Sequence, residues 1–144
     1  MKEICLKIPG KPIAKNRPRF FRAKDYVGTY SDQETEEGRW MWEAKNQITP
    51  ELQRSLPLTG PIRLRLCFMM PTTKGWPKYK IEWINNGLLI PHVKTPDLDN
   101  LIKWVKDCLN GWLWKDDSQV YQIEAYKIYS LEATTSIEII EVGE

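Results

Sequence analysis

One amphipathic stretch, residues 95–110, constrains the fold of this 144-residue chain more than any other feature. Its apolar residues recur every three or four positions, which is the spacing of one helix face: Leu98, Leu101, Ile102, Val105 and Leu109. Thr95 or Asp97 is placed to cap the start of this helix, Pro96 lies at that start, and Gly111 follows its end. We therefore predict a helix with one buried face over these residues.

Other segments alternate between apolar and polar residues with a period of two, which indicates β-strands. The clearest are residues 2–8 and 61–70, and residues 26–30 fit a shorter strand. Residues 120–129 and 135–142 also have strand character, and the short segment between them predicts a hairpin. These strands can form a sheet on which a helix with one buried face packs.

One further helix is expected in the first two thirds of the chain, and a second segment there has two possible structures. Ser31 and Glu34 have capping-box spacing, so a helix is expected from residue 32 to about residue 56. Four positions in this helix are expected to be buried: Trp40, Trp42, Ala44 and Ile48. Pro50 should kink or shorten this helix. Residues 77–86 fit either a short helix ended by Gly87 or a mobile loop.

The order of these elements predicts an α/β (α+β) fold, in which one domain spans residues 1–144 and helices pack on a mixed β-sheet. No stretch approaches the ~20 apolar residues of a membrane span, and the amino terminus lacks the apolar region of a signal peptide. Three cysteines without metal-ligand spacing indicate a reducing cytoplasm. His92 is the single histidine, which excludes a zinc site built on two imidazoles.

The net charge of +2 is a sum of unlike segments. Seven basic residues and no acidic one occur between Lys7 and Lys24, and six basic residues against one acidic residue occur between Arg63 and Lys94. Residues 97–124 instead contain six acidic and three basic residues. This distribution suits an enzyme that binds phosphate groups and concentrates carboxylates around a metal ion, although alternating charge is also ordinary for a protein surface.

The acidic residues include two pairs at the expected ends of elements. Asp97 and Asp99 lie at the start of the helix predicted for 95–110, and Asp116 and Asp117 precede the strand at 120–129. A turn at residues 110–111 is expected to bring this strand beside the helix start. Three converging carboxylates would suit Mg²⁺, and Lys103, one helical turn after Asp99, could sit beside a scissile phosphate. The set predicts metal-assisted phosphodiester hydrolysis.

Each of these residues also has an ordinary structural interpretation. Asp97 and Asp99 could cap a helix, Lys103 could be a solvated partner of Asp99, and the acidic pair could form a turn. Among the basic residues, we expect contacts to DNA phosphates from a proline-flanked loop and from the middle of the chain: Lys15, Arg17, Arg19, Lys74 and Lys94. Trp76 and Trp83 fit either base stacking or core packing.

Three ordered motifs resemble the RusA family of Holliday-junction resolvases. Residues 96–103 read PDLDNLIK, residues 107–111 read DCLNG, and residues 116–120 read DDSQV. The family pattern is PD-x-DN-x-x-K, then D-x-LNG, then DD-x-Q-[VI]. Weaker resemblance covers most of the rest of the chain, including the basic residues 9–19 and Lys127 on the strand after the acidic pair.

This resemblance implies a RusA-like fold and a homodimeric, Mg²⁺-dependent endonuclease that resolves four-way DNA junctions by paired symmetric nicks during recombination and repair. Its catalytic residues fall on Asp97, Asp99, Lys103 and Asp117, and the three aspartates are the metal ligands. Mn²⁺ is expected to substitute for Mg²⁺, with no small-molecule cofactor and no membrane partner. Such enzymes are cytoplasmic and often encoded by phages or prophages. The alternatives are a DNA-binding protein without catalysis, or a nuclease directed at branches and flaps more broadly.

Overall fold

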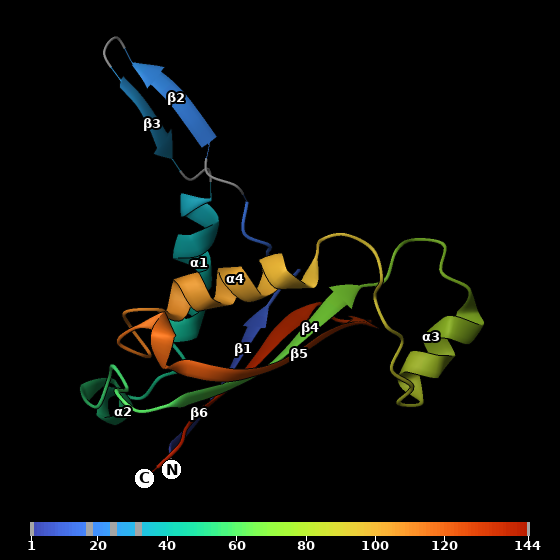
Figure 1. Cartoon of the computed structure of the whole chain (residues 1–144). Coiled ribbons are helices and arrows are strands. Elements are labelled where there is room, and N and C mark those ends of the chain that lie inside the picture. The colour runs from blue at the N-terminus through green and yellow to red at the C-terminus, as the bar shows by residue number, and fades with distance from the viewer. Residues whose placement is uncertain (1, 17–18, 24–25, 31–32, 144) are drawn as a thin grey trace.

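Four strands form one mixed β-sheet at the centre of the computed structural model (Figure 1). They are β1 (Lys2–Pro9), β4 (Ile62–Pro71), β5 (Val120–Ser130) and β6 (Thr134–Glu141), in the spatial order β1-β6-β4-β5. β6 is antiparallel to β1 and β4, whereas β4 and β5 are parallel. The structure describes residues 2–16, 19–23, 26–30 and 33–143, with 19–23 and 26–30 described by their backbone alone.

The hairpin predicted from the last two strands is wrong. β4 lies between β5 and β6, so these two consecutive strands do not pair with each other. The connection between them, residues 131–133, passes the end of β4. Three extended residues are enough for this, because they span ~10 Å, about the distance between strands two places apart in a sheet.

The parallel pair β4 and β5 requires a long crossover, and two helices lie within it. They are α3 (Lys78–Asn85) and α4 (Leu98–Leu109). α3 confirms the helical alternative for residues 77–86, and Gly87 follows it with a φ of +86°, a conformation that glycine adopts without strain. α4 agrees with the helix predicted over residues 95–110.

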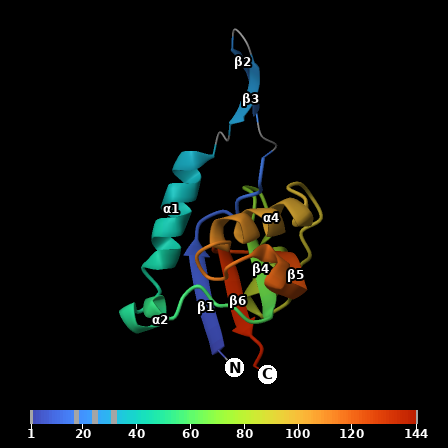
Figure 2. The same cartoon turned by 60° about the vertical axis from the view of Figure 1, so that its left-hand side comes forward.

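The core lies on one face of the sheet, which is covered by α4 and α1 (Glu34–Lys45) (Figure 2). α4 buries Leu101, Val105 and Leu109 of its predicted stripe, while Leu98 and Ile102 are partly buried. The stripe packs on alternate residues of β4: Ile62, Leu64, Leu66 and Phe68. Burying a side chain of this size stabilises a fold by about 1.5–3 kcal/mol, so this contact fixes where α4 lies.

The helix predicted from residue 32 to about 56 is divided in two. α1 ends before Pro50, which begins the short helix α2 (Pro50–Arg54), as expected for a proline at this position. Trp40 and Ala44 of α1 are buried as predicted. Trp42 is 64% exposed, and its predicted burial is wrong, because residues two apart on a helix point ~200° away from each other.

A second, two-stranded sheet projects from this body. β2 (Arg19–Ala23) and β3 (Tyr26–Tyr30) form an antiparallel hairpin that extends beyond the start of α1 (Figure 1). It confirms the strand predicted at residues 26–30. Ser31, the first residue of the predicted capping box, lies outside the described residues. In the part of the chain that the structure describes, no helix has both the length and the apolarity of a membrane span.

Candidate active site

Asp97 and Asp99 lie together at the amino end of α4. Asp97 is the N-cap residue, in an extended conformation, and its backbone carbonyl accepts hydrogen bonds from the amides of Asn100 (3.2 Å) and Leu101 (3.3 Å). Its carboxylate makes no capping hydrogen bond and is exposed. Oδ1 of Asp99 accepts a hydrogen bond of 3.0 Å from the amide of Asn100. The positive end of the helix dipole stabilises both carboxylates, and that of Asp97 is left available for a ligand.

Lys103 lies one helical turn after Asp99 on the exposed side of α4. Among the described side chains it forms no ion pair, whereas Asp107, a further turn along, pairs with Lys15 at 3.4 Å. An ammonium group that forms no ion pair and lies near exposed carboxylates could bind a phosphate group. The structure therefore brings Asp97, Asp99 and Lys103 to one end of α4.

Asp116 and Asp117 have different surroundings. Asp116 caps the short 3-10 helix Asp117–Gln119 by accepting hydrogen bonds from the amide (3.0 Å) and the hydroxyl of Ser118, and these bonds hold the pKa of Asp116 below its usual value. The turn interpretation is confirmed for this residue. Asp117 is half-buried, and its Oδ1 accepts a hydrogen bond of 2.8 Å from Nε1 of the fully buried Trp114.

Asp117 does not join Asp97 and Asp99 within one chain. In a unit of two parallel strands joined by a helix, the helix runs back toward the amino ends of the strands. The amino end of α4 therefore lies toward the carboxyl end of β5 (Figure 1). Asp97 is the N-cap residue of α4, whereas Asp117 precedes the amino end of β5. The 12 residues of α4 separate the two sites by ~18 Å. The expected convergence of three carboxylates is wrong for a single chain, and the described residues contain no group of three His, Cys, Asp or Glu that could hold a metal ion.

Two carboxylates still fit a magnesium ion. Proteins commonly hold Mg²⁺ through one or two carboxylates, while phosphate groups of the substrate and water complete its coordination. Asp97 and Asp99 match this donor set, since both are exposed at the start of α4 and the Asp97 carboxylate is not used as a cap. The residues of one chain therefore fit a two-carboxylate site that is completed by a substrate or by a second chain.

Residues 90–96, here called the strap, lead into this site along the edge of β5. The amide of Tyr129 donates to the carbonyl of Ile90 (2.9 Å), and the amide of His92 donates to the carbonyl of Lys127 (3.0 Å). The His92 ring is buried with its centroid 4.8 Å from that of Tyr129. Burial lowers the pKa of this imidazole, and the nearby charge of Lys127 lowers it further.

Comparison with known protein families identifies the family to which this chain belongs. The model of the family described as endodeoxyribonuclease RusA matches residues 9–140, nearly the whole chain. This chain belongs to the RusA family. RusA enzymes are endodeoxyribonucleases that act on branched DNA and depend on a divalent metal. The mixed sheet with helices packed on it is consistent with a RusA-like fold, and the resemblance at residues 96–120 is confirmed.

The similarity extends over the whole length of the chain. A protein of Bacillus subtilis (strain 168) described as uncharacterized protein YqaN is 32% identical over 143 residues. This match covers 96% of the present chain and 98% of the relative. The two chains therefore correspond over nearly their whole length.

Two of the basic residues expected to bind DNA, Lys15 and Lys94, lie near the carboxylates of this RusA chain. The amide of Lys15 donates a hydrogen bond of 2.9 Å to the carbonyl of Asn100, which places the basic segment beside the start of α4. Lys94 belongs to the strap, and Lys74 follows β4; both are exposed. Arg17 lies outside the described residues, and the backbone of Arg19 lies in β2.

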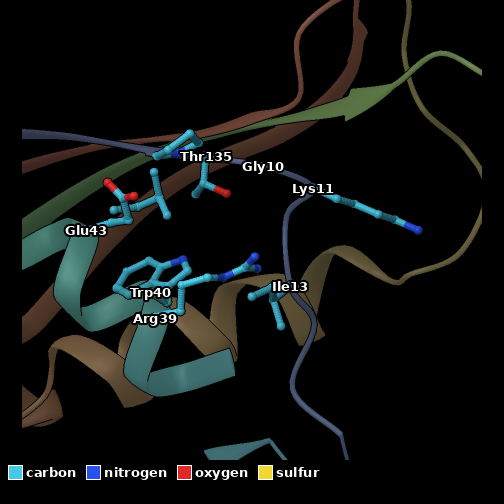
Figure 3. A pocket seen from close by; sticks show the side chains of 9 residues that line it. Gly10, Lys11, Ile13, Arg39, Trp40, Glu43 and Thr135 are labelled. Carbon is cyan, nitrogen blue, oxygen red and sulfur yellow. The ribbon is translucent and has the colours of Figure 1, made fainter. Parts of the chain in front are cut away.

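A pocket of about 280 Å³ lies beside this basic segment, between α1 and the end of β1 (Figure 3). Arg39 and Trp40 of α1 line one side, and Gly10 and Ile13 line the other. Lys11 also lines the pocket, but its side chain extends away from it in Figure 3. The pocket contains both Arg39 and Glu43, so it has no excess of positive charge for phosphate.

Two contacts of residues around the candidate site have no signal in the sequence. Trp114 and Asp117 are only three positions apart in the sequence. The sequence nevertheless does not predict that the buried indole donates a hydrogen bond to this carboxylate. Lys127 donates hydrogen bonds to the backbone carbonyls of Lys94 and Pro96 in the strap. Any residue provides a carbonyl acceptor, so only the folded structure identifies these partners.

Proposed function

We propose that this protein is a Mg²⁺-dependent endonuclease that resolves four-way DNA junctions by paired symmetric nicks in recombination and repair. One observation supports the proposal most strongly: the exposed Asp97 carboxylate lies beside Asp99 at the positive end of α4, with Lys103 one turn away. Carboxylates and an ammonium at a helix start suit a site where a metal ion and a DNA phosphate meet. Family membership adds the class of substrate.

In this proposal Asp97 and Asp99 hold the metal ion, and Mn²⁺ can replace Mg²⁺. The bound ion would activate water and stabilise charge on the scissile phosphate. Lys103 would attract the phosphate to the carboxylates by its positive charge, which opposes the repulsion between two anions. The aspartates and Lys103 thus have distinct roles, and their substitutions should affect metal binding and DNA cleavage differently.

The homodimer is part of the proposal, because one chain does not place Asp117 beside Asp97. A second copy could contribute Asp117 to that site, so that each of two sites uses residues of both chains. Support comes from the amino-terminal half of β5, an edge strand on which Tyr121 and Ile123 are 56% and 37% exposed. An unpaired edge strand is a template for another strand, and antiparallel pairing of β5 with itself is compatible with two-fold symmetry.

Two nicks on strands of like polarity also require two sites, which matches a two-fold dimer to a two-fold junction. Five basic residues would contact DNA phosphates around these sites: Lys15, Arg17, Arg19, Lys74 and Lys94. The enzyme would act in the bacterial cytoplasm, where chromosomal and phage DNA are found.

A cleavage assay tests this proposal. Wild type and Asp97→Asn are incubated with Mg²⁺ and with four-way, three-way, flap and linear duplex DNA. Asp97→Asn should lose nicking and retain junction binding. Glu51→Gln removes an exposed carboxylate on α2, which lies toward the carboxyl end of α4 and away from Asp97, and serves as the control. Undiminished nicking by Asp97→Asn would contradict the assignment. Equal cleavage of flaps and four-way junctions would support the broader branch nuclease, and binding without any cleavage would support a DNA-binding protein.

A further inference from the structure

Lys127 binds the backbone that directly precedes the carboxylates of α4. Its ammonium donates a hydrogen bond of 2.6 Å to the carbonyl of Pro96 and a second hydrogen bond to the carbonyl of Lys94. Pro96 is the neighbour of Asp97, the N-cap residue of α4. Lys127 pairs with the core residue Phe68 of β4, so its side chain extends from the face of the sheet on which α4 packs.

These two hydrogen bonds connect residues 93–96 of the strap to β5. No other described hydrogen bond connects these residues to the sheet. Ile90 and His92 are fixed to β5 by backbone hydrogen bonds of 2.9 and 3.0 Å. Within the described part of the chain, no backbone hydrogen bond joins residues 93–96 to the sheet. Lys127 is therefore the described link between β5 and the last residues of the strap before Asp97.

We propose that Lys127 is a positioning residue of the nuclease: it fixes the carbonyls of Lys94 and Pro96 and thereby the direction of the Asp97 carboxylate. A metal ion requires its ligands within a narrow range of positions, so loosening the backbone beside one ligand weakens binding of the ion. The effect on nicking rests on the proposed function, whereas the effect on the strap depends on the fold alone.

A direct contact between Lys127 and DNA is the main competing role. An ammonium has three N–H donors, and two of them already donate to carbonyls in the absence of DNA. The side chain is also half-buried, unlike the exposed Lys74 and Lys94. Positioning therefore predicts that loss of Lys127 leaves junction affinity and its salt dependence unchanged.

The experiment compares Lys127→Met, which removes the donors and keeps the length, with Lys127→Arg, which keeps donors and charge. Lys7→Met is the control, since Lys7 is an exposed lysine of β1 without a described side-chain hydrogen bond. Hydrogen exchange of residues 93–101 reports on the strap without requiring activity. Single-turnover nicking at saturating junction, the half-saturating Mg²⁺ concentration and the junction Kd are measured in parallel.

Lys127→Met should accelerate exchange in residues 93–101 and leave other segments unchanged. Nicking should fall and the half-saturating Mg²⁺ concentration should rise, each by about 10-fold or more, as for other residues that support metal ligands. The junction Kd should stay within about twofold, because no phosphate contact is lost. Lys127→Arg should recover part of the nicking rate, and Lys7→Met should match wild type.

Unchanged exchange in Lys127→Met would overturn the inference, whatever the nuclease does. A weaker, less salt-dependent junction affinity with unchanged exchange would instead assign Lys127 to a DNA contact. If wild type nicks no substrate, the proposed function fails, while the exchange data still decide whether Lys127 fixes the strap. Lys127→Leu, which also removes the donors, provides the same comparison if Lys127→Met does not fold.

Discussion

Nε1 of Trp114 donates a hydrogen bond of 2.8 Å to Oδ1 of Asp117. The indole is fully buried and the carboxylate is half-buried, so a core residue fixes one of the proposed catalytic aspartates. This contact lies beyond the carboxyl end of α4, whereas Asp97 lies at its amino end. Asp117 is thus held in place at a position where it cannot meet Asp97 of the same chain.

Trp114→Phe should reduce both stability and nicking. Phenylalanine keeps an aromatic ring in the core, but it removes the hydrogen bond to a charged group and leaves part of the indole volume empty. The free energy of unfolding should therefore fall by at least about 1–3 kcal/mol. Asp117 would lose its fixed orientation, and nicking should fall while junction binding remains. Urea denaturation and single-turnover nicking measure the two effects.

Trp112→Phe is the matched control for this prediction. Nε1 of Trp112 also donates a hydrogen bond, but to the uncharged Oε1 of Gln53 at 3.1 Å. Its replacement should cost less stability and leave nicking unchanged. Full nicking by Trp114→Phe, with the expected loss of stability, would show that the orientation of Asp117 is not needed for cleavage.

Mixed dimers test whether the two chains share their sites. Asp97→Asn and Asp117→Asn should each be inactive alone. If Asp97 of one chain works with Asp117 of the other, a dimer with one chain of each variant contains one intact site. Mixing the two proteins should therefore restore nicking of one strand per junction. No activity in the mixture, with dimer exchange confirmed by mass spectrometry, would indicate that the site does not combine these two residues across the dimer.

His92 should make stability depend on pH. Its pKa is lowered from 6.5 by burial and by the nearby charge of Lys127, with smaller effects of Lys94 and Lys11. As the pH falls below 6.5, His92 becomes protonated in the unfolded chain more readily than in the folded chain. The free energy of unfolding therefore falls as the pH falls. His92→Gln should remove this part of the pH dependence. Urea midpoints between about pH 7.5 and pH 5 would check it, and identical curves for both proteins would contradict it.

Lys74 and Lys94 should bind DNA through phosphates. Lys74→Gln and Lys94→Gln should each weaken junction binding and reduce the slope of log K against log salt by about one unit. Lys2→Gln, at the opposite end of the sheet on β1, should leave the slope unchanged. Affinities measured across a range of salt concentrations give these slopes. An unchanged slope for both site variants would exclude them from the phosphate contacts.

Much of the fold could be predicted because it depends on local patterns. The stripe from Leu98 to Leu109 predicts α4, since only a helix places these residues on one face. Pro50 predicts the break between α1 and α2 for a similarly local reason. Strand pairing is not local: nothing in residues 120–142 shows that β4 lies between β5 and β6, so adjacency in sequence led to the wrong hairpin.

The sequence predicts which residues form the candidate site, but it does not predict how all of them are placed relative to one another. Asp97, Asp99 and Lys103 share the start of α4, and their spacing along one helix gives this directly. The place of Asp117 depends on the direction in which α4 runs relative to β5, which no spacing near residues 110–111 encodes. The partners of Lys127 are backbone carbonyls, so they have no side-chain signal at all.

Whether this protein resolves four-way junctions is tested by mapping the product ends on all four strands of a mobile junction. We expect Mg²⁺-dependent nicks at symmetric positions on two strands of like polarity, and none with Asp97→Asn. Nicks on a single strand, equally frequent nicks in linear duplex DNA, or cleavage that persists in Asp97→Asn would contradict this expectation.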